Sequence, residues 1–323
     1  MSDPSGTRAL VTGGAGFIGS HLVDGLIAAG AAEVHVVDDF SLGKEENLAP
    51  RPELTVERAD CADSAALERA LAGRDFDLCF NLAVIPLPAS LVHPAPTVDR
   101  NVAMTTAVCE LGRAGRYRRL VQYSSSEVYG TATVAPMPES HPLLPHTPYA
   151  ASKAATDLVA LSYVTTFGLE GTVVRPFNTY GPRQNDKAYA GLIPAVVRRV
   201  QAGEPVIVHG DGEQTRDMAW VGDIVAGTLA AATTDAALGR VMNLGSGEEH
   251  TVNDMVRWML QALGRENHPV EHGPERPGDV RRLLADTSLA AELIGYAPSK
   301  DIAQGLRETV DWYAARAAAG SRR

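Results

Sequence analysis

Four side chains in the middle of the sequence have the types and spacing needed to remove a proton from an alcohol. Ser125 and Glu127 lie in the run Tyr123-Ser124-Ser125-Ser126-Glu127-Val128-Tyr129-Gly130, which continues an apolar strand pattern at 120–124. Tyr149 and Lys153 open a long helical pattern, and residues four apart share one helix face. A serine hydroxyl, a phenol and an ammonium can therefore converge on one substrate hydroxyl.

The phenol of Tyr149 is the candidate base. Free tyrosine has a pKa near 10, so a base active near pH 7 needs roughly 4 kcal/mol of extra stabilisation of its phenolate. A nearby cation such as Lys153 favours that phenolate. The alternative is an ordinary surface pair at i,i+4. For Glu127 the sequence leaves two interpretations open, a carboxylate that supports the serine loop or a base that acts on the substrate.

A glycine-rich turn near the N-terminus predicts a bound dinucleotide. The run Gly13-Gly14-Ala15-Gly16-Phe17-Ile18-Gly19 follows an apolar strand pattern and opens a helical one, and a second strand pattern at 33–37 ends at Asp38. Strand, glycine turn, helix, strand and acid make the dinucleotide-binding βαβ unit, in which the helix N-terminus holds the pyrophosphate. A carboxylate at Asp38 accepts hydrogen bonds from a free ribose hydroxyl and repels a 2'-phosphate, so NAD is favoured over NADP.

Strand and helix patterns then alternate along the chain. Such alternation predicts a parallel sheet with right-handed crossovers, and ligands bind beyond the carboxyl ends of its strands. We therefore expect an α/β fold, a Rossmann doubly wound parallel sheet with a smaller C-terminal substrate-binding lobe. The predicted Rossmann domain covers residues 1–176 with returning segments at about 217–245, and residues 177–323 mainly form the lobe.

Composition excludes several classes of function. The 323 residues carry a formal net charge of -10, which argues against a nucleic acid or an anionic membrane as the main partner. Three cysteines without a C-x-x-C motif indicate a reducing cytoplasm, and no apolar run reaches the ~20 residues of a membrane span. His268 and His272 have a metal-like spacing, but Pro269 lies between them and no third ligand is near, so no metal is expected.

With Gly13, Gly16 and Gly19, the serine run at 124–130, Tyr149-x-x-x-Lys153, and Arg-Pro-Phe-Asn-Thr-Tyr-Gly-Pro-Arg at 175–183, the chain resembles an extended short-chain dehydrogenase/reductase. Within that superfamily it is similar to the NAD-dependent nucleotide-sugar epimerases, dehydratases and decarboxylases. The resemblance covers nearly the whole chain. It implies a permanently bound NAD, a nucleotide-diphosphate sugar as substrate, with a UDP-sugar favoured, and a homodimer paired through helices at about 98–114 and 149–167.

The resemblance also implies roles for individual residues. Ser125 orients the sugar hydroxyl, Tyr149 is the base and Lys153 supports it, with Glu127 as a further catalytic candidate. The cofactor positions are Gly13, Gly16, Phe17, Ile18, Gly19, Asp38, Asp39, Ser41, Gly43, Asp60, Cys61, Leu82, Ala83, Asn101, Ser124, Tyr149, Lys153 and Pro176. The substrate positions are Ser125, Ser126, Asn178, Arg183, His209, Arg216 and Arg281.

The sequence leaves three hypotheses for the function, and the first two differ in what happens to a 4-keto sugar intermediate. The first expectation is a 4-epimerase of the UDP-glucose or UDP-N-acetylglucosamine type, because the Asp-Glu pair typical of 4,6-dehydratases is replaced here by Ser126-Glu127. The alternative is a 4,6-dehydratase, or a UDP-glucuronate decarboxylase, that uses Glu127. Asp286-Thr287-Ser288 lacks the basic residue usual in such decarboxylases. From a different class, a catalytically dead NAD-binding regulatory protein is the third hypothesis.

Overall fold

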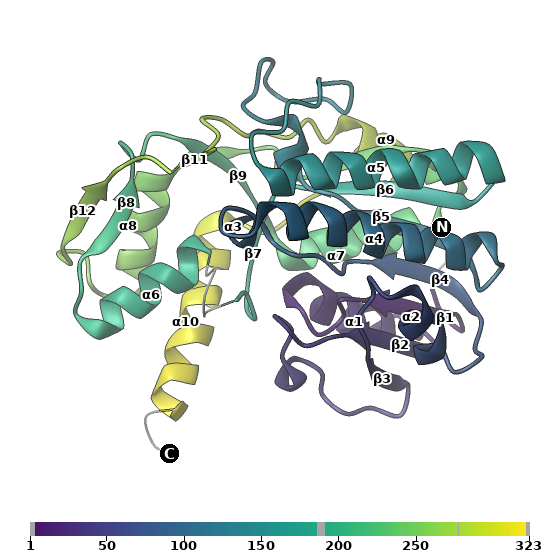
Figure 1. Cartoon of the computed structure of the whole chain (residues 1–323). Coiled ribbons are helices and arrows are strands. Elements are labelled where there is room, and N and C mark those ends of the chain that lie inside the picture. The colour runs from purple at the N-terminus through teal and green to yellow at the C-terminus, as the bar shows by residue number, and fades with distance from the viewer. Residues whose placement is uncertain (1–3, 186–190, 277, 321–323) are drawn as a thin grey trace.

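A seven-stranded, all-parallel sheet forms the centre of the larger part of the molecule (Figure 1). The computed structural model describes residues 4–185, 191–276 and 278–320. The strand order is β10-β6-β5-β4-β1-β2-β3, with the reversal between β1 and β4. This confirms the predicted doubly wound α/β fold. The strands are β1 (Arg8–Thr12), β2 (Glu33–Asp38), β3 (Leu54–Arg58), β4 (Phe76–Asn81), β5 (Tyr117–Tyr123), β6 (Glu170–Pro176) and β10 (Val241–Leu244).

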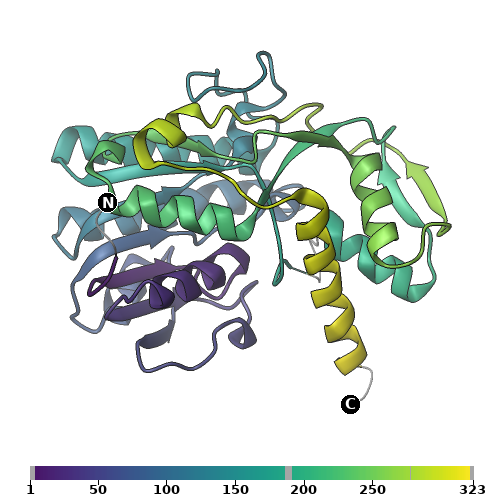
Figure 2. The ribbon, with the colours of Figure 1, turned by 180° about the vertical axis from the view of Figure 1, so that it is seen from behind.

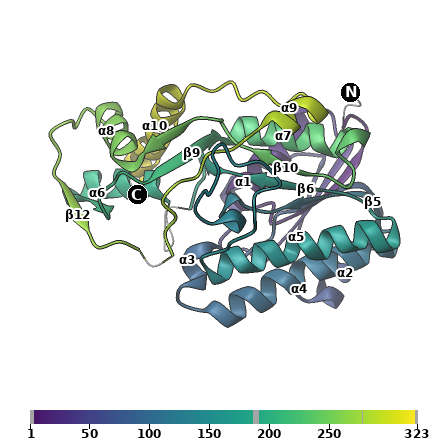
Figure 3. The same ribbon diagram turned by 90° about the horizontal axis from the view of Figure 1, so that it is seen from above.

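Helices cover both faces of this sheet, so its inner strands are continuous apolar runs rather than alternating ones (Figure 3). One face carries α1 (Phe17–Ala28), α7 (Val221–Thr233) and α9 (Ser288–Ile294), and the other carries α2 (Ser64–Ala70), α4 (Pro94–Arg113) and α5 (Pro148–Phe167). The short α3 (Leu87–Ser90) precedes α4. Helix α4 begins earlier than the predicted 98 because proline is tolerated in the first helical turn.

The chain returns to the large domain twice after β6. The first return adds α7 and the edge strand β10, which pairs with β6. The second adds α9, whose Ala290 and Ile294 are buried in the same core as Val11 and Leu22. The domain boundaries predicted from the sequence include the first return, at about 217–245. They place the second return, which contains α9, in the lobe. Helix α9 joins the sheet because its apolar face packs beside α7 and β10.

A smaller lobe lies beside the carboxyl ends of the central strands (Figure 2). Its core is built by α6 (Leu192–Ala202), α8 (Val252–Ala262), α10 (Ile302–Gly320) and the parallel pair β8 (Val206–His209) and β12 (Val270–Gly273). A three-stranded sheet of β7 (Asn178–Tyr180), β9 (Thr215–Trp220) and β11 (Glu249–Thr251) joins the lobe to the large domain. No helix in the described part of the chain is long and apolar enough to cross a membrane.

Candidate active site

One cavity of about 670 Å³ runs along the carboxyl ends of the central strands and into the smaller lobe. It collects all but two of the predicted site residues. Those that line it are Gly13, Gly16, Phe17, Ile18, Gly19, Asp38, Asp39, Ser41, Gly43, Asp60, Cys61, Leu82, Ala83, Ser124, Ser125, Ser126, Glu127, Tyr149, Lys153, Pro176, Asn178, Arg183, His209 and Arg216. The two that do not line it are Asn101 and Arg281.

The glycine turn between β1 and α1 leaves the space that a pyrophosphate needs. Gly13 has φ +70°, and a Cβ there would lie 2.7 Å from the backbone nitrogen of Ala83. A Cβ on Gly19 would lie 2.2 Å from the carbonyl oxygen of Gly13. Helix α1 starts at Phe17 without a side-chain cap, so its first N–H groups point out of the helix end toward the cavity. This backbone cradle fits a dinucleotide.

We expect Gly19→Ala to damage this cradle more than Gly16→Ala. The added Cβ at Gly19 meets backbone at 2.2 Å, whereas at Gly16 the nearest atom is 3.2 Å away. Overpacking of this kind costs about 1–3 kcal/mol. Thermal unfolding and the NAD content of the purified chain measure the effect. Equal melting temperatures and equal NAD content in the two variants would contradict the expectation.

The acidic end of the cavity follows β2 and β3. Asp38 is buried, and its carboxylate accepts hydrogen bonds from the backbone N–H of Ala15 (2.9 Å) and of Phe40 (2.8 Å). Burial raises the pKa of Asp38, while those two N–H groups oppose the rise. A carboxylate has about four acceptor sites, so Asp38 keeps capacity for a ribose hydroxyl. Both carboxylate oxygens of Asp60 accept hydrogen bonds from Nη2 of Arg100, each at 2.8 Å.

Asn101 supports the wall of the cavity and does not line it. Its Oδ1 accepts from the N–H of Ile85 at 2.8 Å, and its Nδ2 donates to the carbonyl of Ile85 and to the hydroxyl of Ser152. Leu82, Ala83 and Ile85 themselves face the cavity. Asn101 therefore fixes the segment after β4 against α5, one layer behind the surface that a nicotinamide would touch.

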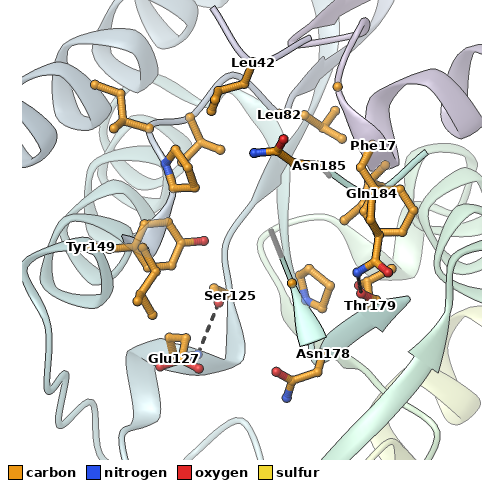
Figure 4. Close-up of a pocket in the computed structure, with 18 of the residues that line it drawn as sticks. Phe17, Leu42, Leu82, Ser125, Glu127, Tyr149, Asn178, Thr179, Gln184 and Asn185 are labelled. Atoms are coloured by element: carbon orange, nitrogen blue, oxygen red, sulfur yellow. Dashed lines mark hydrogen bonds between the residues drawn. The ribbon is translucent and has the colours of Figure 1, made fainter. Parts of the chain in front are cut away.

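Local structure brings the proposed catalytic groups together. Thr147 caps α5 by accepting from the N–H of Ala150 at 3.1 Å, so Tyr149 lies in the first turn and Lys153 one turn later. Ser125 caps the short helix η2 (Ser126–Tyr129) by accepting from the N–H of Glu127 at 3.2 Å. Figure 4 shows Tyr149, Ser125 and Glu127 along one side of the cavity and Asn178 opposite them.

The protein alone does not lower the pKa of Tyr149. Burial raises that pKa to about 12, and the Ser125 hydroxyl opposes the rise. The Lys153 ammonium, one turn further along α5, donates to the carbonyl of Tyr123. Burial lowers the pKa of Lys153 to about 8, and the carboxylate of Asp157 opposes that change. A phenolate at Tyr149 is favoured by cations beside it, such as the Lys153 ammonium and the positively charged ring that bound NAD would supply.

Glu127 lies in the wall of the same cavity. Burial raises the pKa of its carboxyl, the Arg216 guanidinium lowers it, and Asp279 raises it further. Its charge in turn raises the pKa of Tyr149. Glu127 is therefore a titratable group close to the base, in a setting that favours its protonated form more than water does.

Cationic side chains from strand β9 and from two loops border the lobe side of the cavity. Arg183 pairs with Asp24 at 2.8 Å, and Arg216 pairs with Asp279. Arg276 also lines the cavity, and the described residues offer it no carboxylate within ion-pair distance. Sequence reasoning missed Arg276, although its proline-glycine setting was the available signal. Arg281 instead pairs with Asp211 at 2.7 Å, outside the lining.

Two more of the residues predicted to bind substrate, Asn178 and His209, line the cavity. Asn178 lines the cavity, and its Nδ2 is buried with no hydrogen-bond partner among the described residues, as expected for a donor that awaits a ligand. His209 lines it too, with Nδ1 at 3.1 Å from the carbonyl oxygen of Pro274. His268 and His272 bond to backbone carbonyls, and the described residues contain no group of three metal-type ligands.

Comparison with known proteins places this geometry in a family. The family described as GDP-mannose 4,6 dehydratase matches residues 10–309. A dTDP-glucose 4,6-dehydratase from Actinoplanes sp. is 37% identical over 318 residues, covering 95% of this chain and 98% of the relative.

Two solved structures, each 33% identical, have the same fold. The UDP-glucose 4-epimerase from Thermotoga maritima with UDP-glucose has a TM-score of 0.90 and covers 96% of this chain and 99% of its own. The dTDP-glucose 4,6-dehydratase DesIV from Streptomyces venezuelae with NAD bound has a TM-score of 0.90 and covers 96% and 98%. Relatives with this fold therefore include both epimerases and dehydratases.

Proposed function

Because the chain belongs to the GDP-mannose 4,6-dehydratase family of extended short-chain dehydrogenases/reductases, we propose that it oxidises C4 of a nucleotide-diphosphate sugar with bound NAD. The backbone cradle at Gly13 and Gly19 and the carboxylate of Asp38 support the cofactor assignment. A hydroxyl, a phenol and an ammonium at the same cavity wall support the reaction.

The first step follows from the chemistry of three side chains. Ser125 hydrogen-bonds the C4 hydroxyl and orients it, and Tyr149 removes its proton. Bound NAD supplies a hydride acceptor and, later, a hydride donor. The Lys153 ammonium places a positive charge in the same cavity wall as Tyr149, where it favours the phenolate. The result is a 4-keto sugar, whose carbonyl makes the neighbouring C5 proton acidic.

Glu127 lies close to Tyr149, and this position favours a 4,6-dehydratase over other reactions of the 4-keto sugar. After C4 oxidation, Glu127 removes the C5 proton, the C6–oxygen bond breaks, and the same carboxyl returns the proton to the leaving hydroxide as water. The hydride removed from C4 is then returned at C6, and a proton from solvent adds at C5, which gives a 4-keto-6-deoxy sugar. A simple epimerase has no use for a second acid-base group beside Tyr149.

The second candidate is the 4-epimerase expected first from the sequence. Ser126 favours it, because a hydroxyl stands next to Glu127 where 4,6-dehydratases typically have an aspartate. Epimerisation needs only Ser125, Tyr149 and Lys153, with rotation of the keto sugar before the hydride returns. In this case Glu127 supports the serine loop, and the product has the same mass as the substrate.

One experiment separates the two functions. The purified chain is incubated in deuterium oxide with UDP-, dTDP- and GDP-linked sugars, and products are analysed by mass spectrometry and proton NMR. A 4,6-dehydratase gives loss of one water and deuterium at C5. A 4-epimerase gives an isomer without deuterium at C5. No conversion of any sugar, with NAD bound, would instead support the hypothesis of a dead regulatory protein.

Arg276 is the better candidate than Arg281 for holding the diphosphate. Removal of a hydrogen-bonded cation from an anion site costs about 1.5–3 kcal/mol, so Arg276→Ala is expected to weaken UDP binding at least ~10-fold. Arg281→Ala is the matched control, because its guanidinium is engaged with Asp211 outside the lining. Isothermal titration with UDP measures both, and a larger loss in Arg281→Ala would reverse the assignment.

A further inference from the structure

A buried ion pair lies directly behind the catalytic lysine. Asp157 is on α5, one turn after Lys153, and its side chain is completely buried. Its Oδ2 accepts from Nε of Arg175, on β6, at 3.0 Å. Neither residue lines the cavity. Removing one partner of such a pair is strongly destabilising, because the other charge is left buried and unpaired.

The arginine of this pair is itself fixed from two sides. Its Nη1 donates to the hydroxyl of Tyr129 at 2.9 Å, and the guanidinium lies 4.8 Å from the centre of that ring. The Tyr129 hydroxyl donates to Asn243 at 2.7 Å, and Asn243 donates through Nδ2 to the carbonyl of Met137. Asp157 is therefore held in one place by side chains from three elements.

Among the described residues, Asp157 supplies the carboxylate that acts on the charge of Lys153. Its ammonium donates to the Tyr123 carbonyl at the end of β5, and its side chain is 4% exposed. The Oδ1 of Asp157 and the Oγ of Ser124 are both buried, and the Ser124 hydroxyl beside Asp157 lowers the pKa of that carboxyl. Asp157 therefore presents a buried carboxylate one helical turn from the Lys153 side chain.

We propose that Asp157, held by Arg175, is a positioning residue that keeps Lys153 charged beside Tyr149. The inference rests on the proposed function, in which Lys153 works as a cation. A buried ammonium loses hydration and tends to lose its proton, and an opposite charge on the same helix face opposes that loss. The carboxylate of Asp157 raises the pKa of Lys153 against the lowering by burial.

Other charged groups near Lys153, Tyr149 and Asp157 also shift the pKa values in this part of the molecule. From η2, Glu127 raises the pKa of Tyr149, and so does Asp157 itself. From β6, Arg175 lowers the pKa of Asp157, against the rise that burial causes. Glu139 accepts from the N–H of Asn243 at 2.8 Å and lies within the field of Arg175. On the α4 side the neighbouring groups are neutral, the amide of Asn101 and the hydroxyl of Ser152.

A direct measurement of the Lys153 proton tests the proposal without any substrate. The sequence contains four lysines, Lys44, Lys153, Lys187 and Lys300, so ¹³Cε-labelled lysine gives few signals. The Lys153 signal is assigned with Lys153→Met, and its titration is followed by NMR in the NAD-bound chain. In Asp157→Asn we expect the titration midpoint to fall by about one pH unit or more. An unchanged midpoint would overturn the proposal.

Three further variants separate charge from structure. Asp157→Glu keeps the charge and is expected to keep the midpoint near that of the wild type. Asp157→Asn combined with Arg175→Gln removes both charges, so it folds without an unpaired buried cation, and its midpoint is expected between those of the wild type and Asp157→Asn. Asp217→Asn removes another fully buried carboxylate, one that holds the 245–247 turn, and is expected to lower the melting temperature without moving the Lys153 midpoint.

Kinetics give a second, separable result. If Lys153 loses its proton at lower pH, the alkaline limb of kcat/KM moves to lower pH in Asp157→Asn by about the same amount as the NMR midpoint. KM for the nucleotide sugar is expected to stay within two-fold, because Asp157 lies outside the cavity lining. An NMR shift without any turnover in the wild type would count against the proposed function and leave the role of Asp157 standing.

Discussion

Tyr149→Phe is expected to lower kcat by roughly 10²–10⁴-fold while the chain still binds NAD. Phenylalanine keeps the ring that packs at the start of α5 and removes only the hydroxyl that takes the C4 proton. The fold, the glycine cradle and the carboxylate of Asp38 do not depend on that hydroxyl. Turnover is measured by proton NMR of the sugar, and NAD content by release from the denatured chain.

Tyr163→Phe is the matched control for that change. Tyr163 lies on the same helix, and its hydroxyl donates to Glu110 at 2.5 Å outside the cavity. We expect this variant to keep kcat within two-fold. If Tyr149→Phe retained full turnover, another group would have to be the base, and the chemistry assigned to this wall of the cavity would be wrong. If it lost bound NAD as well, loss of turnover would not identify Tyr149 as the base.

Glu127→Gln is expected to stop water loss and C5 exchange while C4 oxidation continues. Glutamine has the shape of glutamate but cannot accept the C5 proton. With a single turnover of substrate, bound NAD is still reduced, so absorbance at the reduced cofactor's wavelength rises and persists. We expect a decrease of at least ~10²-fold in formation of the 4-keto-6-deoxy sugar. Rapid mixing with absorbance detection and mass spectrometry of quenched samples measure the two steps separately.

The same variant decides between the two candidate products. If the chain is a 4-epimerase, Glu127→Gln still forms the isomer, and no deuterium enters C5 in either protein. Glu139→Gln is the control, because burial raises the pKa of Glu139 as it does that of Glu127, yet Glu139 lies outside the cavity lining. It is expected to leave the nature of the product unchanged. A Glu127→Gln variant that still eliminates water would contradict the dehydratase mechanism.

The pH dependence of Glu127 follows from its surroundings. Burial raises the pKa of its carboxyl, so the basic form that removes the C5 proton becomes available at higher pH than for an exposed glutamate. The Arg216 guanidinium opposes this rise, and a diphosphate bound to it would weaken that effect. The acid limb of the elimination step is therefore expected above the ordinary pKa of glutamate, and it should disappear in Glu127→Gln.

Local patterns are strong enough to identify most of this site. The glycine turn, the acid at Asp38 and the Tyr149–Lys153 spacing each depend on residues close together in the chain. The glycine turn and the Tyr149–Lys153 pair are each set by one turn or one helix, whereas Asp38 meets the glycine turn through the pairing of β1 with β2. All of them line one cavity. The order of strands and helices likewise specifies a doubly wound sheet, since parallel strands joined by right-handed crossovers have few other arrangements.

The sequence alone does not determine which arginine of the loop that contains Arg276 and Arg281 lines the cavity. Arg276 and Arg281 belong to the same loop, and nothing in the order of residues says which one faces the cavity. The choice depends on Asp211, which comes from another loop and binds Arg281. Asn101 is a similar case, because its contacts with Ile85 and Ser152 arise only when α4 packs against α5 and the segment after β4.

The chain's own order of residues thus predicts a nucleotide-binding fold, a dinucleotide cradle and the serine, tyrosine and lysine that we propose for alcohol oxidation, because the glycine turn, the serine run and the Tyr149–Lys153 spacing are each short-range patterns. Packing between distant segments decides the rest. It buries Glu127 beside Tyr149, turns Lys153 toward the carbonyl of Tyr123, and sets Asp157 against Arg175. Burial and neighbouring charge control protonation, and both exist only after α5, β6 and the lobe have come together.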